Sequence, residues 1–245
     1  MTESYKIKII QPSGEILTPK DEITEFPYHL ERAGRTCYKS LDRITESSAE
    51  KFCRMIIKRG HESVLEHKNI TCRIIGDRSM SHQLVRHRLS AFSQESQRFC
   101  NYGKDEVLEV ILPPSIMVVK EPTIIEYHIA ENGYEEIEID GTGEIQINHR
   151  FMLWFYSIAS AYTNYLNLLN NEVPPEDARS VLPNATKTEI VTTFNIRMWR
   201  HVFKERAFNS HAQWQIKDIM LSLYKEMNEL VPCLFEDLSD EGSKK

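Results

Sequence analysis

The chain has 245 residues, and its 30 Lys and Arg against 36 Asp and Glu give a formal net charge of −6. Such a length suits one well-buried domain, which we expect over residues 1–236, followed by a polar, frayed C-terminal tail over 237–245. An acidic balance argues against a protein that coats nucleic acid polymers, because that task needs a basic surface. No apolar run approaches the roughly 20 residues that cross a membrane, and no signal-peptide core follows Met1. We therefore expect a cytoplasmic protein without a membrane partner.

Cysteine usage points to free thiols. The chain has five cysteines, an odd number, and none of them has a C-x-x-C spacing: Cys37, Cys53, Cys72, Cys100 and Cys233. A disulfide scaffold or a zinc ribbon would need paired spacings. We expect buried or neutral free cysteines.

Strands and helices are both predicted in the first half of the chain. Residues 6–10 are predicted to form a strand, and residues 69–75 alternate apolar and polar side chains, as a half-buried strand does. Ser-Ser-Ala-Glu at residues 47–50 resembles a capping box for a helix that ends before Gly60. Ser79 is expected to cap a short helix that runs to about Arg88.

The second half continues this mixture. Strands are predicted at residues 107–112 and 189–193, and a hairpin around the Asp-Gly dipeptide is predicted over 136–147. Residues 148–170 are predicted to form a long helix, whose aromatic and leucine side chains suit a core or a subunit interface. Further helices are expected to open at residues 174–177, with proline and acids in the first turn, and after an Asn195 cap.

A last helix is predicted after Ser-His-Ala-Gln at residues 210–213, which has the form of a second capping box. This helix is expected to bury Ile216, Ile219, Met220, Leu223 and Met227. Because strands and helices are interspersed without βαβ units, we expect an α+β fold in which helices pack on a mixed or antiparallel sheet.

The densest cluster of cations in this acidic chain is Arg86-His87-Arg88, with Arg98 ten residues further on. A guanidinium offers planar, two-pronged hydrogen bonding that matches phosphate and carboxylate oxygens. The cluster therefore predicts an anion site, with a solvated run of surface charge as the alternative. Ser96 has no G-x-S-x-G elbow around it, so we expect its hydroxyl to hydrogen-bond a ligand.

Two further segments carry residues that could perform chemistry. His61 and His67 are six residues apart, so they cannot share a helix face as i, i+4 metal ligands do. We expect no metal there, and either a polar loop or a loop that touches a cofactor. Arg197 and His201 do share a helix face. Because the chain has no G-x-G-x-x-G and no P-loop, a nucleotide would be bound by side chains and helix ends.

Five segments, in chain order, resemble motifs of the flavin-dependent thymidylate synthases, the ThyX family. Gly60-His61-Glu62-Ser63 followed by Glu66-His67 is similar to the family's GHE(S/T)xxEH stretch, and Arg86-His87-Arg88 with Ser96 matches its RHR-x7-S signature. Residues 179–183 resemble its AR-x-x-LP turn, residues 195–206 its N-x-R segment and later arginine, and residues 210–216 its SHAQWEI stretch. Gln94 stands where many members have Glu, Ala91 where they often have Ser, and His201 where some have Asn.

The resemblance implies an enzyme of the ThyX fold that makes dTMP from dUMP. Its carbon donor would be 5,10-methylenetetrahydrofolate, its redox cofactor FAD and its reductant NADPH, and no cysteine nucleophile would take part. It also implies a homotetramer whose active sites are shared between subunits. The sequence assigns no role to the inserted segment over residues 120–147.

The resemblance also assigns site residues. It places FAD against Ser63, Arg86, His87, Arg88, Gln94, Asn195, Arg197 and His201. It places dUMP against Gln83, Arg86, Gln94, Glu95, Ser96, Gln97, Arg98, Arg179 and Arg206. Arg206 would stabilise negative charge that develops on the uracil, Ser96 would orient the nucleotide, and His61 would help to arrange flavin and folate.

Two other classes of function use the same residues. A non-catalytic nucleotide- or RNA-binding module would use the arginines and bind polynucleotides in a salt-sensitive manner. A metal-dependent hydrolase would use His61, His67, His82 and His87 as ligands and lose activity to a chelator.

Overall fold

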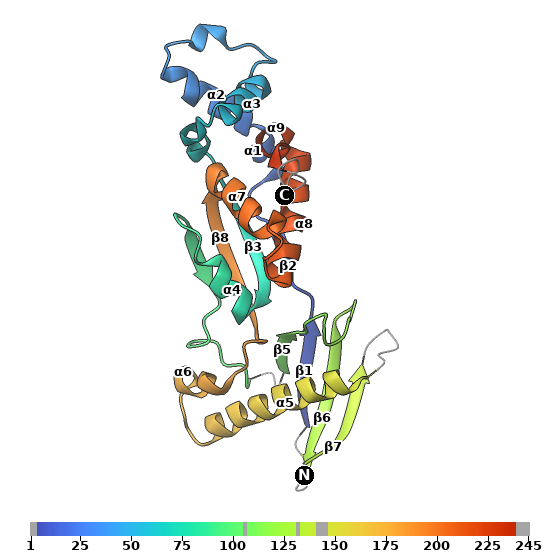
Figure 1. Cartoon of the computed structure of the whole chain (residues 1–245). Helices are drawn as coiled ribbons and strands as arrows, with labels where there is room; N and C mark the ends of the chain where they lie inside the picture. The colour runs from blue at the N-terminus through green and yellow to red at the C-terminus, as the bar shows by residue number, and fades with distance from the viewer. Residues whose placement is uncertain (1–3, 105–106, 131–132, 141–146, 239–245) are drawn as a thin grey trace. The chain divides into compact units, whose positions relative to one another are not determined.

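The computed structural model describes residues 4–104, 107–130, 133–140 and 147–238 (Figure 1). The chain divides into two compact units. One comprises residues 1–12, 75–81 and 94–189, and the other comprises residues 13–74, 82–93 and 190–245. The expected single domain over residues 1–236 stays a prediction.

The first unit is built on a four-stranded sheet with the order β5-β1-β6-β7. Strand β1 (Ser4–Ile10) pairs in parallel with β5 (Val107–Ile111) and antiparallel with β6 (Thr123–Ala130). Strand β7 (Gly133–Asp140) pairs antiparallel with β6. The sheet is therefore mixed, as the sequence predicts, because β1 has one neighbour of each direction.

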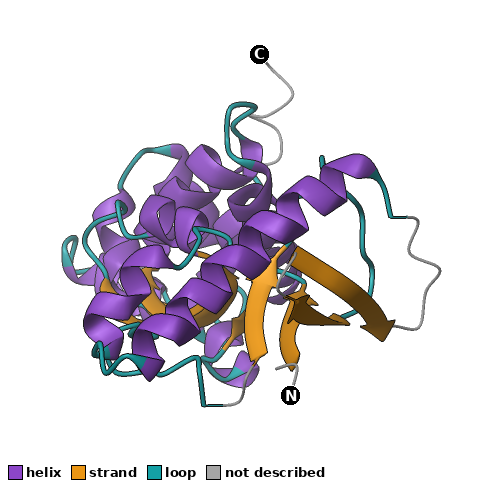
Figure 2. Cartoon of the chain, turned by 90° about the horizontal axis from the view of Figure 1, so that it is seen from below, coloured by secondary structure: helices purple, strands orange, loops and turns teal. Residues whose placement is uncertain are grey.

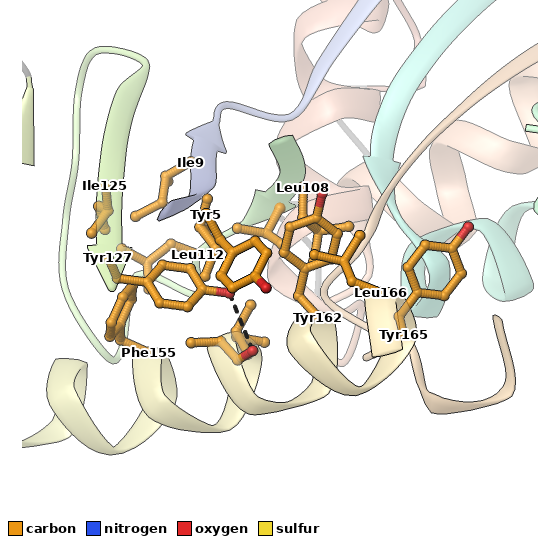
Figure 3. Packing of buried hydrophobic residues seen from close by; sticks show 14 of the residues in the cluster. Tyr5, Ile9, Leu108, Leu112, Ile125, Tyr127, Phe155, Tyr162, Tyr165 and Leu166 are labelled. Carbon is orange, nitrogen blue, oxygen red and sulfur yellow. Dashed lines mark hydrogen bonds between the residues drawn. The ribbon is translucent and has the colours of Figure 1, made fainter. Parts of the chain in front are cut away.

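Helix α5 (His149–Asn170) covers this sheet and completes the core of the first unit (Figure 3). Its N-cap is Asn148, whose side chain accepts a hydrogen bond from Phe151 N. Tyr127 of β6 meets Phe155 edge-on, and its hydroxyl donates to the carbonyl of Ala159 at 3.3 Å. The short helix α6 (Pro175–Ala178) and the 3-10 turn η3 (Arg179–Val181) follow α5.

A second four-stranded sheet has the order β2-β3-β8-β4. Its strands are β2 (Ser13–Ile16), β3 (Asn69–Asp77), β8 (Lys187–Asn195) and β4 (Ala91–Gln94). Every second residue of β3 from Ile70 to Ile74 is buried, which confirms the predicted alternation. Helix α4 (Arg78–Leu84) follows β3 directly.

The second unit carries most of the helices. Its N-terminal part holds α1 (Lys20–Thr24), α2 (Phe26–Thr36), the turn η1 (Leu41–Arg43), α3 (Ala49–Lys58) and the turn η2 (Glu62–His67). Its C-terminal part holds α7 (Ile196–Val202), the π-helical turn η4 (Phe203–Phe208), α8 (Trp214–Leu230) and α9 (Pro232–Phe235). The described chain contains both helices and strands (Figure 2), in runs without a regular βαβ alternation, which confirms the α+β class.

Three predicted helix caps are wrong, although the helices exist. Ser48 precedes α3, but its hydroxyl donates to Glu31 and caps nothing. Helix α4 begins one residue before Ser79, because Asp77 Oδ1, and not the Ser79 hydroxyl, accepts from Met80 N. The helix ends at Leu84. Helix α8 is capped by Gln213, whose side chain accepts from the backbone at Gln215 and Ile216. Its five predicted core residues are all buried.

One further prediction is described only in part, and another is corrected. Residues 136–140 form a strand, and β7 pairs with β6. The second half of the predicted hairpin falls on residues 141–146, which lie outside the described part, so that pairing stays a prediction. The predicted frayed tail is wrong at its start, since Asp237 pairs with Arg200 and Leu238 is 1% exposed. Within the described residues, no helix has both the length and the apolarity to span a membrane.

Candidate active site

Helix α7 presents the predicted residues of the second unit on a rigid base. Strand β8 ends at Asn195, whose side-chain oxygen accepts from Met198 N at 2.8 Å and starts the helix. Trp199, fully buried one helical turn on, donates its indole N–H to the carbonyl of Ile70 in β3 at 3.0 Å. The core side of α7 is thereby fixed, and Arg197 and His201 lie on its exposed side.

Arg206 and His87 link two predicted site segments by a hydrogen bond. Arg206 Nε donates to His87 Nε2 at 3.0 Å, and the His201 ring meets the His87 ring edge-on at 5.7 Å between centroids. Burial, followed by the charges of Arg206 and His201, lowers the pKa of His87 from 6.5 to about 4. The imidazole is therefore neutral at pH 7, and its Nε2 lone pair orients the Arg206 guanidinium.

A cleft of about 560 Å³ opens beside α7 and is here named the α7 cleft. It is lined by Glu62, Glu66, Arg88, Leu89, Asn195, Arg197, Met198, Arg200, His201 and Lys204. Arg197 is held in its wall by Glu66, at 2.6 Å from Nη1 to Oε1, and by Glu62 at 3.6 Å. Four of the lining side chains are permanent cations, so the cleft favours an anionic ligand.

Arg200, which the sequence analysis did not single out, is the buried cation of this cleft. It is 2% exposed, and it makes a two-pronged pair with Asp237 at 2.7 Å for each bond. Burial alone would raise the pKa of Asp237, but the hydrogen bonds and charge of Arg200 hold it below its ordinary value. Arg200 Nε has no hydrogen-bond partner, and the nearest carboxylate oxygen, on Glu62, is 3.9 Å away.

That buried N–H is evidence for a ligand, because unsatisfied buried donors are rare in folded proteins. The sequence offered little to find Arg200. Its position beside His201 resembles an ordinary surface cation, and its partner Asp237 fell in the segment expected to be a frayed tail.

A larger pocket, of about 1050 Å³, lies among α2, η1, α3 and η2 and is here named the α3 pocket. His61 and Ser63, two of the predicted site residues, line it. Glu62 and Arg197 line both this pocket and the α7 cleft, so the two cavities of the second unit share a boundary. Gly60 allows the turn into this loop, because its φ of 71° lies in the left-handed region.

The first unit holds a separate group of predicted residues around Glu176. Arg98 Nε donates to Glu176 Oε2 at 2.7 Å, and Arg179 Nε donates to the backbone carbonyl of the same residue at 2.9 Å. Ser96 Oγ accepts from Arg98 N at 3.3 Å. Three residues assigned to the nucleotide are therefore brought together at one end of α6.

Gln94 and Glu95 are engaged within the first unit. Gln94 Nε2 donates to Thr188 Oγ1 at 3.1 Å. Glu95 accepts from the Tyr102 hydroxyl at 2.8 Å and pairs with Lys187 at 2.9 Å. Their predicted ligand contacts stay predictions, as do those of Gln83, Arg86 and Gln97.

The predicted site residues thus fall into two groups. The second unit contributes His61, Ser63, Gln83, Arg86, His87, Arg88, Asn195, Arg197, His201 and Arg206. The first unit contributes Gln94, Glu95, Ser96, Gln97, Arg98 and Arg179. Across the described residues, no three His, Cys, Asp or Glu side chains gather as a metal site requires, which leaves the hydrolase alternative without a ligand set there.

The chain is similar to known proteins over most of its length. The family model described as "Thymidylate synthase complementing protein" matches residues 23–233. The flavin-dependent thymidylate synthase of Mycobacteroides abscessus is 33% identical over 215 residues, which cover 86% of this chain and 79% of that protein. That of Corynebacterium aurimucosum is 34% identical over 216 residues, which cover 85% and 78%.

A solved structure has the same fold. The UMP/dUMP methylase PolB from Streptomyces cacaoi, in a crystal structure with 5-Br UMP, superposes with a TM-score of 0.67. The match covers 96% of this chain and 97% of that chain, at 19% sequence identity. This likeness confirms the predicted fold.

Proposed function

The chain belongs to the family of the flavin-dependent thymidylate synthases, and we propose on that premise that it converts dUMP to dTMP. The carbon donor is 5,10-methylenetetrahydrofolate, and NADPH reduces a bound FAD. The observation that carries this proposal is the pair of Arg206 and neutral His87 beside a cleft lined by four cations.

The donors of the α7 cleft fit the phosphates of a flavin dinucleotide. Arg200 offers a buried N–H without a partner, and Arg88 and Lys204 line the same cleft. Asn195, Arg197 and His201 complete the set that the family resemblance assigns to FAD. When bound, the flavin supplies the reducing equivalents that turn a methylene group into a methyl group. The protein binds and orients the reactants.

Arg206 has the electrostatic role in this proposal. His87 accepts from its Nε, so the remaining N–H groups of the guanidinium are free to face the uracil oxygen on which negative charge develops. Such a donor lowers the barrier because it is already oriented before the reaction. The phosphate of dUMP is assigned to Arg98 and Arg179, which both bind Glu176, and to Ser96, whose hydroxyl accepts from Arg98 N.

No cysteine serves as nucleophile in this proposal. The neighbouring Cys233 thiol and burial raise the pKa of Cys53, and burial raises that of Cys72. Buried thiols with raised pKa values stay protonated at pH 7 and react poorly. Cys37, which lines the α3 pocket, and the half-buried Cys100 are tested below.

We also assign the chain to a homotetramer with shared active sites. Helix α5 supports this assignment, because Leu153 and Tyr156 lie on its outer side, 57% and 37% exposed. Exposed apolar side chains at i, i+3 are suited to a helix that packs against another subunit.

The test combines a spectrum with a product assay. Purified protein reconstituted with FAD should show a flavin absorption band that NADPH bleaches, and addition of dUMP and 5,10-methylenetetrahydrofolate should yield dTMP. Absence of flavin binding, or flavin reduction without dTMP, would contradict the proposal. Binding of RNA without any flavin would favour the nucleic-acid module instead.

A further inference from the structure

The α3 pocket is larger than its predicted residues require. Its volume of about 1050 Å³ lies at the upper end of small-molecule sites. Only three of its lining residues, His61, Ser63 and Arg197, have a role in the proposed function. The rest of its wall comes from α2, η1 and α3, for which the reaction has no assigned use.

Three cations that line this pocket have no ion-pair partner among the described residues. Arg43 lies on η1, and Lys51 and Arg59 lie on one face of α3 and its C-cap, about 12 Å apart along the helix axis. Within the described residues, none of the three has a carboxylate partner. Glu62 is the only carboxylate among the described lining residues, and it pairs with Arg197. Arg43, Lys51 and Arg59 together are here named the cationic wall.

Other arginines in the same region behave differently. Arg35 also lines the pocket, but two of its nitrogens lie 2.7 Å from Glu31 Oε1, and its guanidinium stacks over the Phe52 ring at 5.2 Å. Arg54, on the other side of α3, pairs with Glu50 and Glu236. Arg35 and Arg54 are therefore neutralised by carboxylates, whereas no described carboxylate pairs with the three cations that line the pocket beside Arg35.

The pocket also has an apolar part in its lining. Phe52, Met55 and Ile56 of α3 line it together with Val64 of η2. A ligand that fits both surfaces has an apolar or aromatic part and several negative charges spread along a chain. The pocket also shares Glu62 and Arg197 with the α7 cleft, so its occupant lies next to the group that the cleft binds.

We propose that the cationic wall of Arg43, Lys51 and Arg59 binds the carboxylates of the glutamyl tail of the folate co-substrate. This inference rests on the proposed function. A poly-γ-glutamyl tail carries one carboxylate per residue along an extended chain, which suits cations spaced along a helix. The charges of a pyridine nucleotide are concentrated on its phosphates, and dUMP carries a single phosphate. The enzyme therefore prefers folates with several glutamates.

The test compares 5,10-methylenetetrahydrofolate with one and with five glutamates as substrate. For the wild type, the KM of the pentaglutamate should be lower by roughly tenfold, because solvent-exposed ion pairs each contribute little but three act together. The ratio of the two KM values should fall toward one in the triple variant Arg43→Gln, Lys51→Gln, Arg59→Gln. It should also shrink at high salt, which screens exposed charges.

Lys58→Gln is the matched control, because Lys58 is exposed on the same helix but does not line the pocket. This variant should keep the wild-type KM ratio. The triple variant should keep its FAD content and its KM for dUMP, since the cationic wall is assigned to neither ligand.

Four results would overturn the inference. Equal KM values for the two folates in the wild type would do so without any variant, while continued dTMP formation would leave the proposed function intact. Loss of FAD from the triple variant would assign the wall to the flavin. A raised KM for NADPH with an unchanged folate ratio would assign it to the pyridine nucleotide. Absence of dTMP with both folates would reject the proposed function itself.

Discussion

At the scale of single residues, His87 is the side chain to which the structure adds most. The family resemblance assigns it to FAD, which stays a prediction, and in the structure its buried ring accepts a hydrogen bond from Arg206 at Nε2. A neutral histidine suits this task, since a protonated one would place two positive charges in contact. Arg86 and Arg88 on either side are exposed. The middle residue of the motif therefore orients Arg206 from a buried position, while the outer two face solvent.

Replacement of Arg206 and His87 tests this relationship. Arg206→Ala should lower kcat by roughly 10²- to 10³-fold, or about 2.7–4 kcal/mol of barrier. His87→Phe keeps an aromatic ring but removes the acceptor, and should lower kcat less. In the double variant the effect of His87→Phe should nearly vanish, because His87 acts through Arg206. Additive losses in a steady-state double-mutant cycle would show that His87 acts directly.

The lowered pKa of His87 predicts how stability depends on pH. The unfolded chain takes up a proton at this histidine near pH 6.5, but the folded protein resists until about pH 4. His87 therefore costs no stability above pH 6.5, and the free energy of unfolding falls as pH drops from there toward about 4. Urea denaturation at pH 7.5 and pH 5 should show a smaller acid loss in His87→Gln than in the wild type. His29→Gln, an exposed change, should match the wild type.

Cysteine replacement tests the absence of a covalent nucleophile. Cys37→Ser and Cys100→Ser, singly and together, should keep most of the wild-type kcat and the same KM for dUMP, because neither thiol has a role in the proposed reaction. Complete loss of turnover in a variant that still binds FAD and unfolds at the wild-type urea concentration would contradict this.

At the scale of elements, the C-terminal segment supports the site. Helix α9 ends at Phe235, and Asp237 follows it to pair with Arg200 of α7. Leu234 also accepts from Arg200 through its backbone carbonyl. The end of the chain thereby holds a buried cation in the wall of the α7 cleft.

Asp237→Asn should destabilise the protein by about 1–2 kcal/mol, since it removes one charge of the pair and leaves Arg200 buried. The value lies below that for a fully buried pair because the Asp237 side chain is 42% exposed. It should also weaken FAD binding, which a flavin titration measures. Asp218→Asn, an exposed change on α8, should alter neither stability nor flavin affinity. An unchanged urea midpoint in Asp237→Asn would refute the supporting role.

The elements also show what sequence patterns can and cannot locate. The long helix α5 and the strand β3 have a strong apolar period, and both were predicted to within a few residues. Caps were less predictable, because Ser, Asp and Gln near a helix start can all accept from its first N–H groups. The pairing of β7 with β6 was not predicted from the sequence, because it depends on the register between two strands and not on a local turn signal.

At the scale of the whole molecule, the proposed tetramer predicts both mass and complementation. Light scattering should give about 115 kDa, four times the chain mass of 28.7 kDa. Arg206→Ala and Arg98→Ala should each have strongly reduced activity as pure proteins. If subunits share active sites, tetramers formed by co-expression of both should recover measurable dTMP formation, because one intact site can draw each arginine from a different chain.

The control for complementation pairs two substitutions in the second unit, Arg206→Ala and His87→Phe. Mixed tetramers of these two variants should not exceed the activity of the less affected parent. A monomer of 28.7 kDa, or mixed tetramers as inactive as the parents, would contradict shared sites.

The sequence by itself determined the α+β class, most of the regular elements, the family and the residues that carry the family motifs. Local patterns hold this information, because apolar period, turn residues and motif spacing act over a few neighbouring positions. The tertiary structure alone decided that His87 orients Arg206, that Arg200 is a buried cation tied to Asp237, and that Arg43, Lys51 and Arg59 face one pocket. Each of these arrangements is made by residues that are far apart in the chain. Burial and pairing, which turn an ordinary arginine into a binding residue, arise only when the fold brings such segments together.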